Sequence, residues 1–328
     1  MITRRKICFV LGTASFATPV ASFAQTRPPT VGFIDGLPAG SATSRVGVAA
    51  FEQGMREAGW VAGKTFILEY RSTNGRPEQY VSIAAEMVRL GPSVILTVGD
   101  ALIREVAKAT TSIPIVMASV GDPVIAGFTK SLARPDRNIT GMSNLAVGLI
   151  GKWVELLAEL TPRGSTYGVL RSATNTTHDR FWAEAEASAA ATGNKLVSLF
   201  YRNQTELEAA LAETARARPA ALLVLPDPVT TSRNDAIAEF ALKHRLPSIY
   251  LFREPVALGG LLSYGPSRAD NFRRSAAYVD KILRGAKPAE LPIEQVRQFE
   301  LALNMKTAAA LGIRPPNSLL LRVTELIE

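Results

Sequence analysis

The sequence predicts an α/β protein of two doubly wound, parallel-sheet domains joined by a three-strand hinge. Short apolar, β-branched runs alternate with longer segments of helical period along nearly the whole chain. Some runs, such as residues 93–98, are apolar almost throughout, which is typical of strands buried on both faces of a parallel sheet. A length of 328 residues suits two domains. This alternation places the chain in the doubly wound class.

The first half of the chain is expected to hold four strands and three helices. The strands are rich in Val, Ile, Leu or aromatic residues, whereas the helices carry apolar residues three and four positions apart. The expected strands are residues 30–34, 66–70, 93–98 and 114–118. The expected helices are residues 44–58, 77–90 and 101–109.

The second half repeats this order and ends with one more strand and helix. The expected strands are residues 166–170, 195–201, 221–225 and 248–251. The expected helices are residues 148–160, 179–191, 205–217 and 229–244. A strand at 299–303 leads into a last helix, for which Asn304 is a suitable N-cap and Gly312 a suitable residue just past the end.

Three irregular segments interrupt the alternation and predict the places where the chain passes between domains. They are residues 131–141, 252–265 and 284–295, which are rich in Pro, Gly and turn-forming residues. We therefore assign residues 25–143 and 260–285 to the first domain, and residues 144–259 and 286–328 to the second. The alternative is that these segments are surface loops of one large domain.

Residues 1–24 have the pattern of an export signal peptide. Arg4, Arg5 and Lys6 form a basic start, a charge-free stretch follows, and Ser22-Phe23-Ala24 offers small residues for cleavage before Gln25. The stretch lacks the roughly 20 predominantly apolar residues of a spanning helix, so we favour secretion to the periplasm over a membrane anchor. The Arg4-Arg5 pair resembles a twin-arginine signal and leaves the export route open.

The charge pattern and the cysteine content exclude several kinds of partner and site. Removing the leader lowers the net charge from +8 to +5, and Lys and Arg are scattered among Asp and Glu. This mixed pattern argues against a nucleic-acid partner. The only cysteine, Cys8, lies inside the leader and not at the end of its apolar run, so we expect no disulfide, thiol nucleophile, thiolate metal site or lipid anchor.

A search for catalytic groups finds no recognised motif. His178 and His244 are the only histidines and lie in no metal-ligand spacing, and we expect both at the surface. Neither GxSxG nor GxGxxG occurs, and residues 59–65 are one residue short of a phosphate-binding loop and follow a helix. We therefore expect no catalytic residue, metal or cofactor. A carboxylate pair distant in sequence remains an open alternative.

Several segments together resemble one family, the substrate-binding proteins of ABC transporters of the tryptophan/tyrosine type. They lie in the family's order over nearly the whole chain after the leader. The matching segments are FEQGMREAGWVAG (51–63), LEYRSTNGRPEQY (68–80), IPIVMASVGDP (113–123), SLARPDRNITG (131–141), GGLLSYGP (259–266), AAYVDKILRGAKP (276–288), LPIEQ (291–295) and FELALNMKTAAALG (299–312). Two positions depart from the family pattern: Asp136-Arg137 replaces a glycine pair, and Val323-Thr324 replaces alanine and aspartate.

The resemblance implies a type I periplasmic-binding-protein fold that closes around a small solute by a hinge motion. It also implies a monomeric receptor that delivers this solute to an ABC permease in the inner membrane. The family's naming points to an aromatic amino acid or a related carboxylate as the solute. Three alternatives keep the same fold: a ligand sensor for a signalling partner, a two-domain periplasmic enzyme, and a DNA-binding repressor. The repressor requires a helix-turn-helix before the first strand, where only the leader and a short segment are present.

Ligand is expected between the domains, at the carboxyl ends of strands from both. Hydroxyls and backbone amides would hold a carboxylate, an acidic side chain would bind an ammonium, and aromatic rings would stack on the apolar part. The candidates from the first domain are Asp35, Gly36, Gly99, Asp100, Ser119, Val120 and Asp122. The candidates from the second domain are Ser172, Thr174, Asn175, Asp227, Phe252, Arg253 and Glu254, with Tyr264 near a domain crossing.

Overall fold

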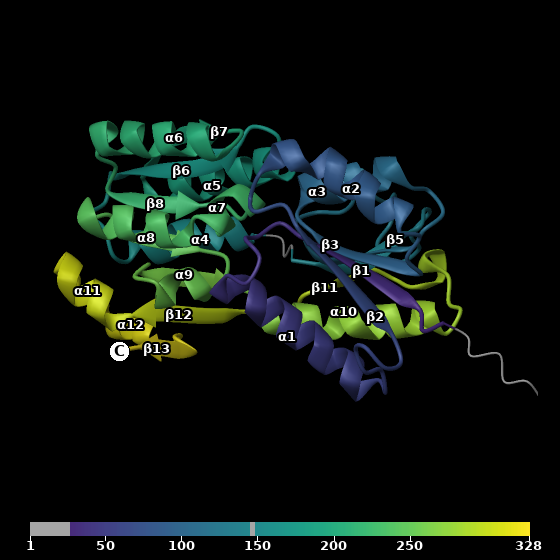
Figure 1. Cartoon of the computed structure of the whole chain (residues 1–328). Helices are drawn as coiled ribbons and strands as arrows, with labels where there is room; N and C mark the ends of the chain where they lie inside the picture. The colour runs from purple at the N-terminus through teal and green to yellow at the C-terminus, as the bar shows by residue number, and fades with distance from the viewer. Residues whose placement is uncertain (1–26, 145–147) are drawn as a thin grey trace, which may run out of the picture.

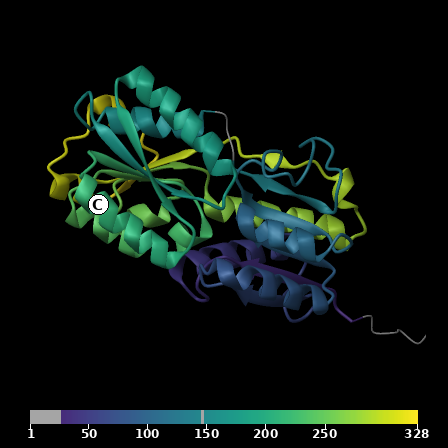
Figure 2. The ribbon, with the colours of Figure 1, turned by 90° about the horizontal axis from the view of Figure 1, so that it is seen from above.

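The computed structural model describes residues 27–144 and 148–328 and shows two α/β domains side by side (Figure 1). Each domain has one sheet with helices on both faces, so the predicted fold class is confirmed. Seen from above, the two domains form separate lobes that lie side by side (Figure 2). The predicted signal peptide, residues 1–24, lies outside the described residues.

The N-terminal domain contains a six-stranded parallel sheet in the order β11-β5-β4-β3-β1-β2. Its strands are β1 (Thr30–Asp35), β2 (Ile67–Ser72), β3 (Val94–Val98), β4 (Ile115–Val120), β5 (Ile139–Ser143) and β11 (Glu294–Gln295). Its helices are α1 (Ala42–Glu57), η1 (Pro77–Gln79), α2 (Tyr80–Arg89), α3 (Asp100–Ala109), α10 (Arg268–Leu283) and η2 (Pro288–Glu290). One core lies between the sheet and α1 with α10, and a second lies between the sheet and α2 with α3.

The C-terminal domain contains a seven-stranded sheet in the order β13-β12-β10-β9-β8-β6-β7, in which only the β10–β12 pair is antiparallel. Its strands are β6 (Thr166–Ser172), β7 (Lys195–Tyr201), β8 (Ala221–Val224), β9 (Ser248–Tyr250), β10 (Leu262–Gly265), β12 (Glu300–Asn304) and β13 (Glu325–Ile327). Its helices are α4 (Leu149–Ala158), α5 (Thr177–Thr192), α6 (Gln204–Ala217), α7 (Pro228–Ser232), α8 (Asn234–Lys243), α9 (Glu254–Ala257), α11 (Met305–Leu311) and α12 (Asn317–Leu320).

The chain crosses between the domains after β5, after β10 and after β11. The domain boundaries differ from the predicted ones in two places, because β10 pairs with β9 and β12 of the C-terminal sheet, whereas β11 pairs with β5 of the N-terminal sheet. Residues 260–265 therefore belong to the C-terminal domain and residues 286–295 to the N-terminal domain. Both strands are short, and their membership depends on partners distant in sequence.

The predicted helix at 229–244 is divided into α7 and α8. Arg233 ends α7 with φ −121°, a value outside the helical range, and the same residue precedes the first turn of α8. Residues 131–141 and 252–265, predicted as irregular, contain the start of β5 and all of α9 and β10. These elements are only four or five residues long, too short to show a periodic pattern.

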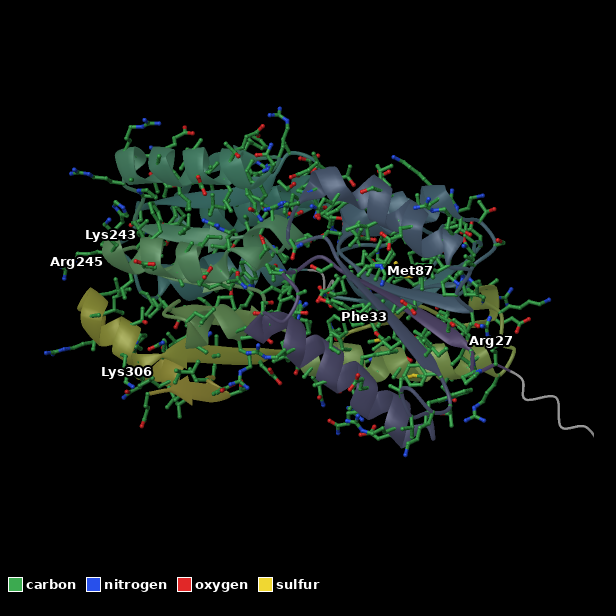
Figure 3. The ribbon with its side chains drawn as sticks, viewed as in Figure 1. Arg27, Phe33, Met87, Lys243, Arg245 and Lys306 are labelled. Carbon is green, nitrogen blue, oxygen red and sulfur yellow. The ribbon has the colours of Figure 1, made fainter. Side chains whose placement is uncertain are left out.

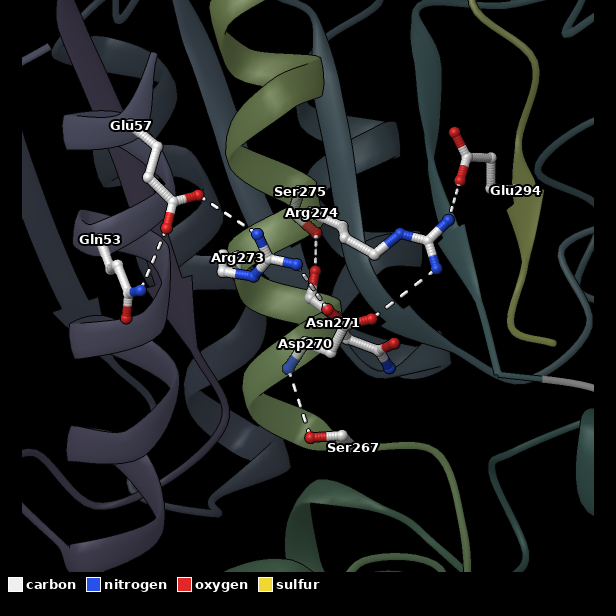
Figure 4. Close-up of polar contacts among 9 residues, drawn as sticks. All are labelled: Gln53, Glu57, Ser267, Asp270, Asn271, Arg273, Arg274, Ser275 and Glu294. Carbon is white, nitrogen blue, oxygen red and sulfur yellow. Dashed lines mark hydrogen bonds and ion pairs between the residues drawn. The ribbon is translucent and has the colours of Figure 1, made fainter. Parts of the chain in front are cut away.

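Helix α10 follows a strand of the C-terminal domain but packs firmly in the N-terminal domain. Arg273 donates to Glu57 of α1 over 3.2 Å, and Arg274 forms an ion pair with Glu294 of β11 (Figure 4). Gly54 permits the close approach of the two helices, since a Cβ atom there would lie 2.3 Å from the Arg273 carbonyl oxygen. The first turn of α10 is therefore held in a fixed place beside the second domain crossing.

Apolar side chains fill the space between each sheet and its helices. Phe33 and Met87 are fully buried in the two cores of the N-terminal domain, whereas Lys243, Arg245 and Lys306 extend outward from the C-terminal domain (Figure 3). Among the residues that the structure describes, no helix combines the length and apolar character that crossing a bilayer requires.

Candidate functional site

A cavity of about 60 Å³ lies between the two domains. It opens at the carboxyl ends of β1, β3 and β4 on one side and of β8 and β9 on the other, where open α/β sheets bind ligands. Its lining residues are Gly36, Leu37, Val98, Gly99, Asp100, Ser119, Val120, Gly121, Asn144, Leu149, Ile150, Asn175, Thr177, Phe181, Pro226, Asp227, Pro228, Thr231, Leu251, Phe252 and Arg268.

Asp100 is the buried carboxylate of the N-terminal wall. It begins α3 directly after Gly99, whose φ of +77° suits glycine and turns the chain sharply out of β3. Its Oδ1 accepts a hydrogen bond from the Gly121 N–H over 3.1 Å, and its Oδ2 accepts one from Thr177 of the other domain. Burial raises the pKa of Asp100, and these hydrogen bonds partly offset that rise.

Asp227 is the buried carboxylate of the C-terminal wall. It caps α7, since its Oδ1 accepts a hydrogen bond from the Val229 N–H over 3.0 Å, and Pro228 occupies the first helical position. Burial raises the pKa of Asp227 to about 6; the Val229 N–H opposes this rise, while the negative charge of Asp100 adds to it. Two carboxylates from different domains thus face the same small space.

His178 lies behind the C-terminal wall and not at the surface, so the expectation of an exposed histidine is wrong at this position. It is 1% exposed in the first turn of α5. Its Nδ1 accepts the Ser172 N–H over 2.9 Å, which leaves Nε2 to donate to the Pro226 carbonyl over 3.2 Å. Burial lowers the pKa of His178 to about 3, so the ring is neutral and joins two loops of the site.

Glycines allow the two walls to touch. A Cβ atom on Gly36 would lie 2.8 Å from Cβ of Pro228, and one on Gly99 would lie 2.7 Å from Cγ of the same proline. A Cβ atom on Gly121 would lie 2.6 Å from Cγ2 of Thr177. All of these contacts join the N-terminal domain to the C-terminal domain, so the structure shows the cleft closed.

Polar contacts around the rim also join the domains in this closed arrangement. Arg180 of α5 forms an ion pair of 2.9 Å with Asp122, and Arg104 of α3 donates to Thr176 over 3.3 Å. On another side, Gln204 of α6 donates to the Asn74 carbonyl oxygen over 3.0 Å. Opening the cleft would break these contacts, so they contribute to the balance between the open and closed forms.

Arg268, the first residue of α10, contributes a buried guanidinium to the cavity wall. It is 4% exposed and lies over the ring of Phe252, with 5.5 Å from the guanidinium carbon to the ring centroid, and over that of Phe272, with 5.1 Å. Its Nε and Nη2 atoms have no hydrogen-bond partner within the described residues. A buried cation with free donors is suited to an anionic ligand group.

Asn144 lies beside the first domain crossing and adds an amide to the wall. Its Nδ2 donates to Ser119 Oγ over 2.6 Å, and its Oδ1 accepts a hydrogen bond from Asn271 of α10 over 2.6 Å. Asn144 and Asn271 therefore link the end of β4 to α10, the helix that carries Arg268.

The structure brings eight of the fifteen predicted ligand-binding residues to the cavity. They are Gly36, Gly99, Asp100, Ser119, Val120, Asn175, Asp227 and Phe252. All of them follow or end a strand that points at the cleft, as the sheet topology requires. Whether they bind ligand stays a prediction.

Seven predicted residues do not line the cavity. Asp35 is buried behind it, and Asp122 forms the rim ion pair. Ser172, the last residue of β6, hydrogen-bonds to Thr174 in the loop that follows. Arg253 pairs with Glu325 at the surface, Glu254 begins α9, and Tyr264 stacks on Phe299 with 5.7 Å between ring centroids.

Sequence reasoning missed the residues contributed by the domain crossings and by the starts of helices. The unpredicted lining residues are Leu37, Val98, Gly121, Asn144, Leu149, Ile150, Thr177, Phe181, Pro226, Pro228, Thr231, Leu251 and Arg268. Arg268 had a local signal, because Ser267 is a suitable N-cap and its Oγ accepts the Asp270 N–H over 3.4 Å. That signal marks a helix start but not its place beside the cleft.

Comparisons with known proteins agree with this architecture. A tyrosine-binding protein from Clostridioides difficile (strain R20291) is 23% identical over 265 residues, which cover 80% of this chain and 76% of the relative. The crystal structure of an ABC domain with L-Trp from Streptococcus pneumoniae superposes with a TM-score of 0.84 at 22% identity, over 92% of this chain and 100% of that one.

A third solved structure shares the fold, and a family model matches most of the chain. The ligand-free, open structure of a substrate-binding protein with adhesive properties from Clostridium difficile superposes with a lower TM-score of 0.63 at 20% identity, over 91% of this chain and 99% of that one. The model of the ABC transporter substrate-binding protein family matches residues 42–327, and the chain therefore belongs to this family, as the sequence segments indicated.

Proposed function

We propose that this protein captures a small organic solute between its two domains and delivers it to an ABC permease, without altering the solute chemically. The observation that carries the proposal is the closed interdomain cavity, which is lined from both domains and contains a buried arginine with free donors. Hinged closure would enclose the solute, and the rim contacts would break on its release.

The proposed solute is an aromatic amino acid or a related carboxylate. Two related proteins support this class, since one is named for tyrosine and the other was crystallised with L-Trp. The cavity wall is compatible with such a solute because Leu149, Ile150 and Phe181 offer apolar contact, whereas Asn144 and Asn175 offer hydrogen-bonding amides.

The proposed place of action is the periplasm. The basic start, charge-free stretch and Ala24-Gln25 cleavage position in residues 1–24 support export, and capture of a solute for an importer requires a protein outside the inner membrane. We propose that the mature protein acts there as a monomer.

A thermal-shift screen tests the capture of solute. The mature protein is unfolded and refolded to remove any bound solute and is then heated with individual amino acids, aromatic acids and sugars. A true ligand at about 100 times its dissociation constant should add roughly 2.7 kcal/mol to the free energy of unfolding and raise the melting temperature by several degrees. If no small solute raises it, the proposed function is wrong.

A second measurement tests delivery and the absence of catalysis. Uptake of the radiolabelled ligand should fall in cells that lack this chain and recover when the gene is restored. The ligand recovered after long incubation with the protein should be chemically unchanged. Conversion of the ligand would instead favour an enzyme, and normal uptake without the chain would exclude the transport role.

A further inference from the structure

Exposed basic residues gather at the end of the C-terminal domain that lies opposite the cleft. The strands β6, β7, β8 and β9 are neighbours in the sheet and run parallel, so their amino ends meet at one edge. Each of these basic residues lies at the start of one of the four strands or a few residues before it. They are Arg163, Lys195, Arg216, Arg218, Lys243 and Arg245, which we call the basic face. Lys243 and Arg245 extend from the end of the domain that is farthest from the N-terminal domain (Figure 3).

No acidic residue neutralises the basic face. The segments that lead into the four strands, residues 162–165, 193–194, 218–220 and 244–247, contain neither Asp nor Glu. Within the described residues, none of the six basic side chains forms an ion pair, not even with Glu213 of α6 or Glu239 of α8, the acidic residues that come last along these helices. The six charges exceed the net charge of +5 that remains without the leader, so the rest of the chain is nearly neutral. Basic residues that are scattered in the sequence are thus collected at one face by the sheet.

Stabilisation of helix ends accounts for only part of the basic face. Arg216 and Lys243 lie in the last turns of α6 and α8, where a positive charge stabilises the partial negative charge of the helix end. This effect falls off within one turn. Arg163 lies in the loop before β6, and Lys195 is the first residue of β7. The charges of these two residues therefore need another explanation.

Arg218 and Arg245 occupy backbone positions that favour glycine. Both follow a helix and lie in the left-handed region, with φ values of +47° and +56°. Two other helices of the same domain, α5 and α11, end with Gly193 and Gly312 in this conformation. An arginine there costs conformational energy, because its Cβ atom crowds the backbone. That this cost occurs twice on one face favours a role for the positive charge outside the fold.

The layout of the basic face suits a flat anionic surface. Adjacent strands lie about 4.8 Å apart, so the four strand starts spread the charges over roughly 15 Å. The helices α5, α6 and α8 reach this face only with their last turns, whereas proteins that read nucleic acids place a helix or a β-ribbon in a groove. Leu242, which is 37% exposed beside Lys243, adds an apolar side chain of the kind that enters the boundary of a bilayer.

We infer that the basic face binds the surface of a bilayer that contains anionic phospholipids such as phosphatidylglycerol. Lys and Arg side chains near such a surface are attracted by its negative potential. The basic face lies at the amino ends of the strands and the cavity at the carboxyl ends of β8 and β9, so this contact leaves the cleft free to open and close. In the periplasm, where we propose that the protein acts, it would hold the receptor beside the membrane that carries the permease.

Sedimentation with vesicles tests the inference on the mature protein. The vesicles contain phosphatidylcholine alone or mixed with phosphatidylglycerol, in about 0.05 M and about 0.5 M NaCl. The test variant combines Arg218→Gly with Arg245→Gly, because glycine suits the left-handed backbone at both positions and the fold is retained. The matched control combines Arg134→Gln with Arg137→Gln, which removes two exposed, unpaired positive charges from the N-terminal domain. The melting temperature of both variants is also measured.

We expect the unchanged protein to sediment with the phosphatidylglycerol vesicles at low salt and not with phosphatidylcholine alone. Each basic residue near an anionic bilayer contributes about fivefold to affinity, so the test variant should bind about 25-fold more weakly. The control should change affinity by less than about twofold, and high salt should abolish binding. The melting temperature of the test variant should be no lower than that of the unchanged protein, and its affinity for solute should be unaltered.

Several outcomes would overturn the inference. An equal loss of vesicle binding in the control would show that net charge governs binding and not the basic face. Binding that survives in the test variant or at high salt would exclude an electrostatic contact at this face. If the protein ignores both kinds of vesicle, the assignment to a membrane is wrong, and capture on immobilised polyglutamate or DNA that the test variant loses would assign the face to an acidic macromolecule. Solute capture is measured without vesicles, so the proposed function would stand in each case.

Discussion

Closure of the cleft depends on the absence of a side chain at Gly36. This residue follows β1, and its φ lies outside the left-handed region, so alanine can adopt its backbone conformation without strain. In the closed structure, however, the added Cβ atom would lie 2.8 Å from Cβ of Pro228 in the other domain. Carbon atoms in contact prefer roughly 3.5–4.0 Å. Gly36→Ala should therefore oppose closure without disturbing either domain.

The size of the effect follows from this overlap. The two walls would have to separate by about 1 Å or shift sideways, and overpacking of this kind costs about 1–3 kcal/mol. Since only the closed form suffers the clash, the cost appears in ligand binding. It corresponds to a loss of affinity of about 5-fold to 150-fold. The ligand-free protein should keep its melting temperature, because Gly36 meets Pro228 only when the cleft closes.

Calorimetric titration with the ligand found in the thermal-shift screen measures this loss. The matched control is Gly151→Ala on α4, where a Cβ atom would meet its nearest neighbour at 3.6 Å, an ordinary contact. Pro228→Gly removes the atom that the new methyl group meets, so the double variant should bind better than Gly36→Ala alone. If Gly36→Ala binds as tightly as the unchanged protein, the closed arrangement described here is not the ligand-bound one.

Three further predictions concern pH, the rim and the core. The pKa of Asp227 is about 6 in the folded protein, against 3.8 for an ordinary carboxyl. The folded protein therefore holds the Asp227 proton more tightly than the unfolded chain does, so this carboxyl stabilises the fold below about pH 4, and the stabilisation is lost as the pH rises through 6. Asp227→Asn, which keeps a capping oxygen, should raise ligand-free stability at pH 7 by roughly 3 kcal/mol in calorimetry, and a loss of stability there would contradict this. Arg180→Gln removes the rim ion pair with Asp122 and should weaken ligand binding by up to about fivefold. This loss of affinity should be smaller at high salt, which screens the ion pair, and a loss that does not depend on salt would contradict the prediction. Trp153→Ala should cost about 3–5 kcal/mol in urea denaturation, since the ring is fully buried and its Nε1 donates to the Tyr264 carbonyl over 2.7 Å, and a cost below about 1 kcal/mol would refute this.

Local patterns were sufficient for the long elements and for the loops that follow central strands. The strand at 195–201 matches β7 residue for residue, and the Asn304 cap and Gly312 end of α11 are as expected. Asp100 and Asp227 were identified as site residues because each follows a buried strand, and parallel strands bring their carboxyl ends to one edge. Such features depend on a few consecutive residues.

Short elements and domain membership were not predictable in the same way. β10 has four residues and β11 has two, and each is defined only by the strands beside it. A two-residue strand has no hydrophobic period, and the choice between two sheets depends on pairing over long sequence distances. The boundaries at 260 and 286 were therefore misplaced.

The sequence by itself determined the α/β class, the alternation of most strands and helices, the family, and the strand-end positions of Gly99, Asp100 and Asp227. Only the tertiary structure decided that Arg268 and Asn144 join these residues around one cavity, that Pro228 meets Gly36, and that Asp35 and Tyr264 lie outside the cavity. The physical reason is the range of the interactions. Hydrophobic period and helix capping act over a few residues, whereas the cavity is made by domain crossings and helix starts that come together only when both domains have folded and the hinge has closed.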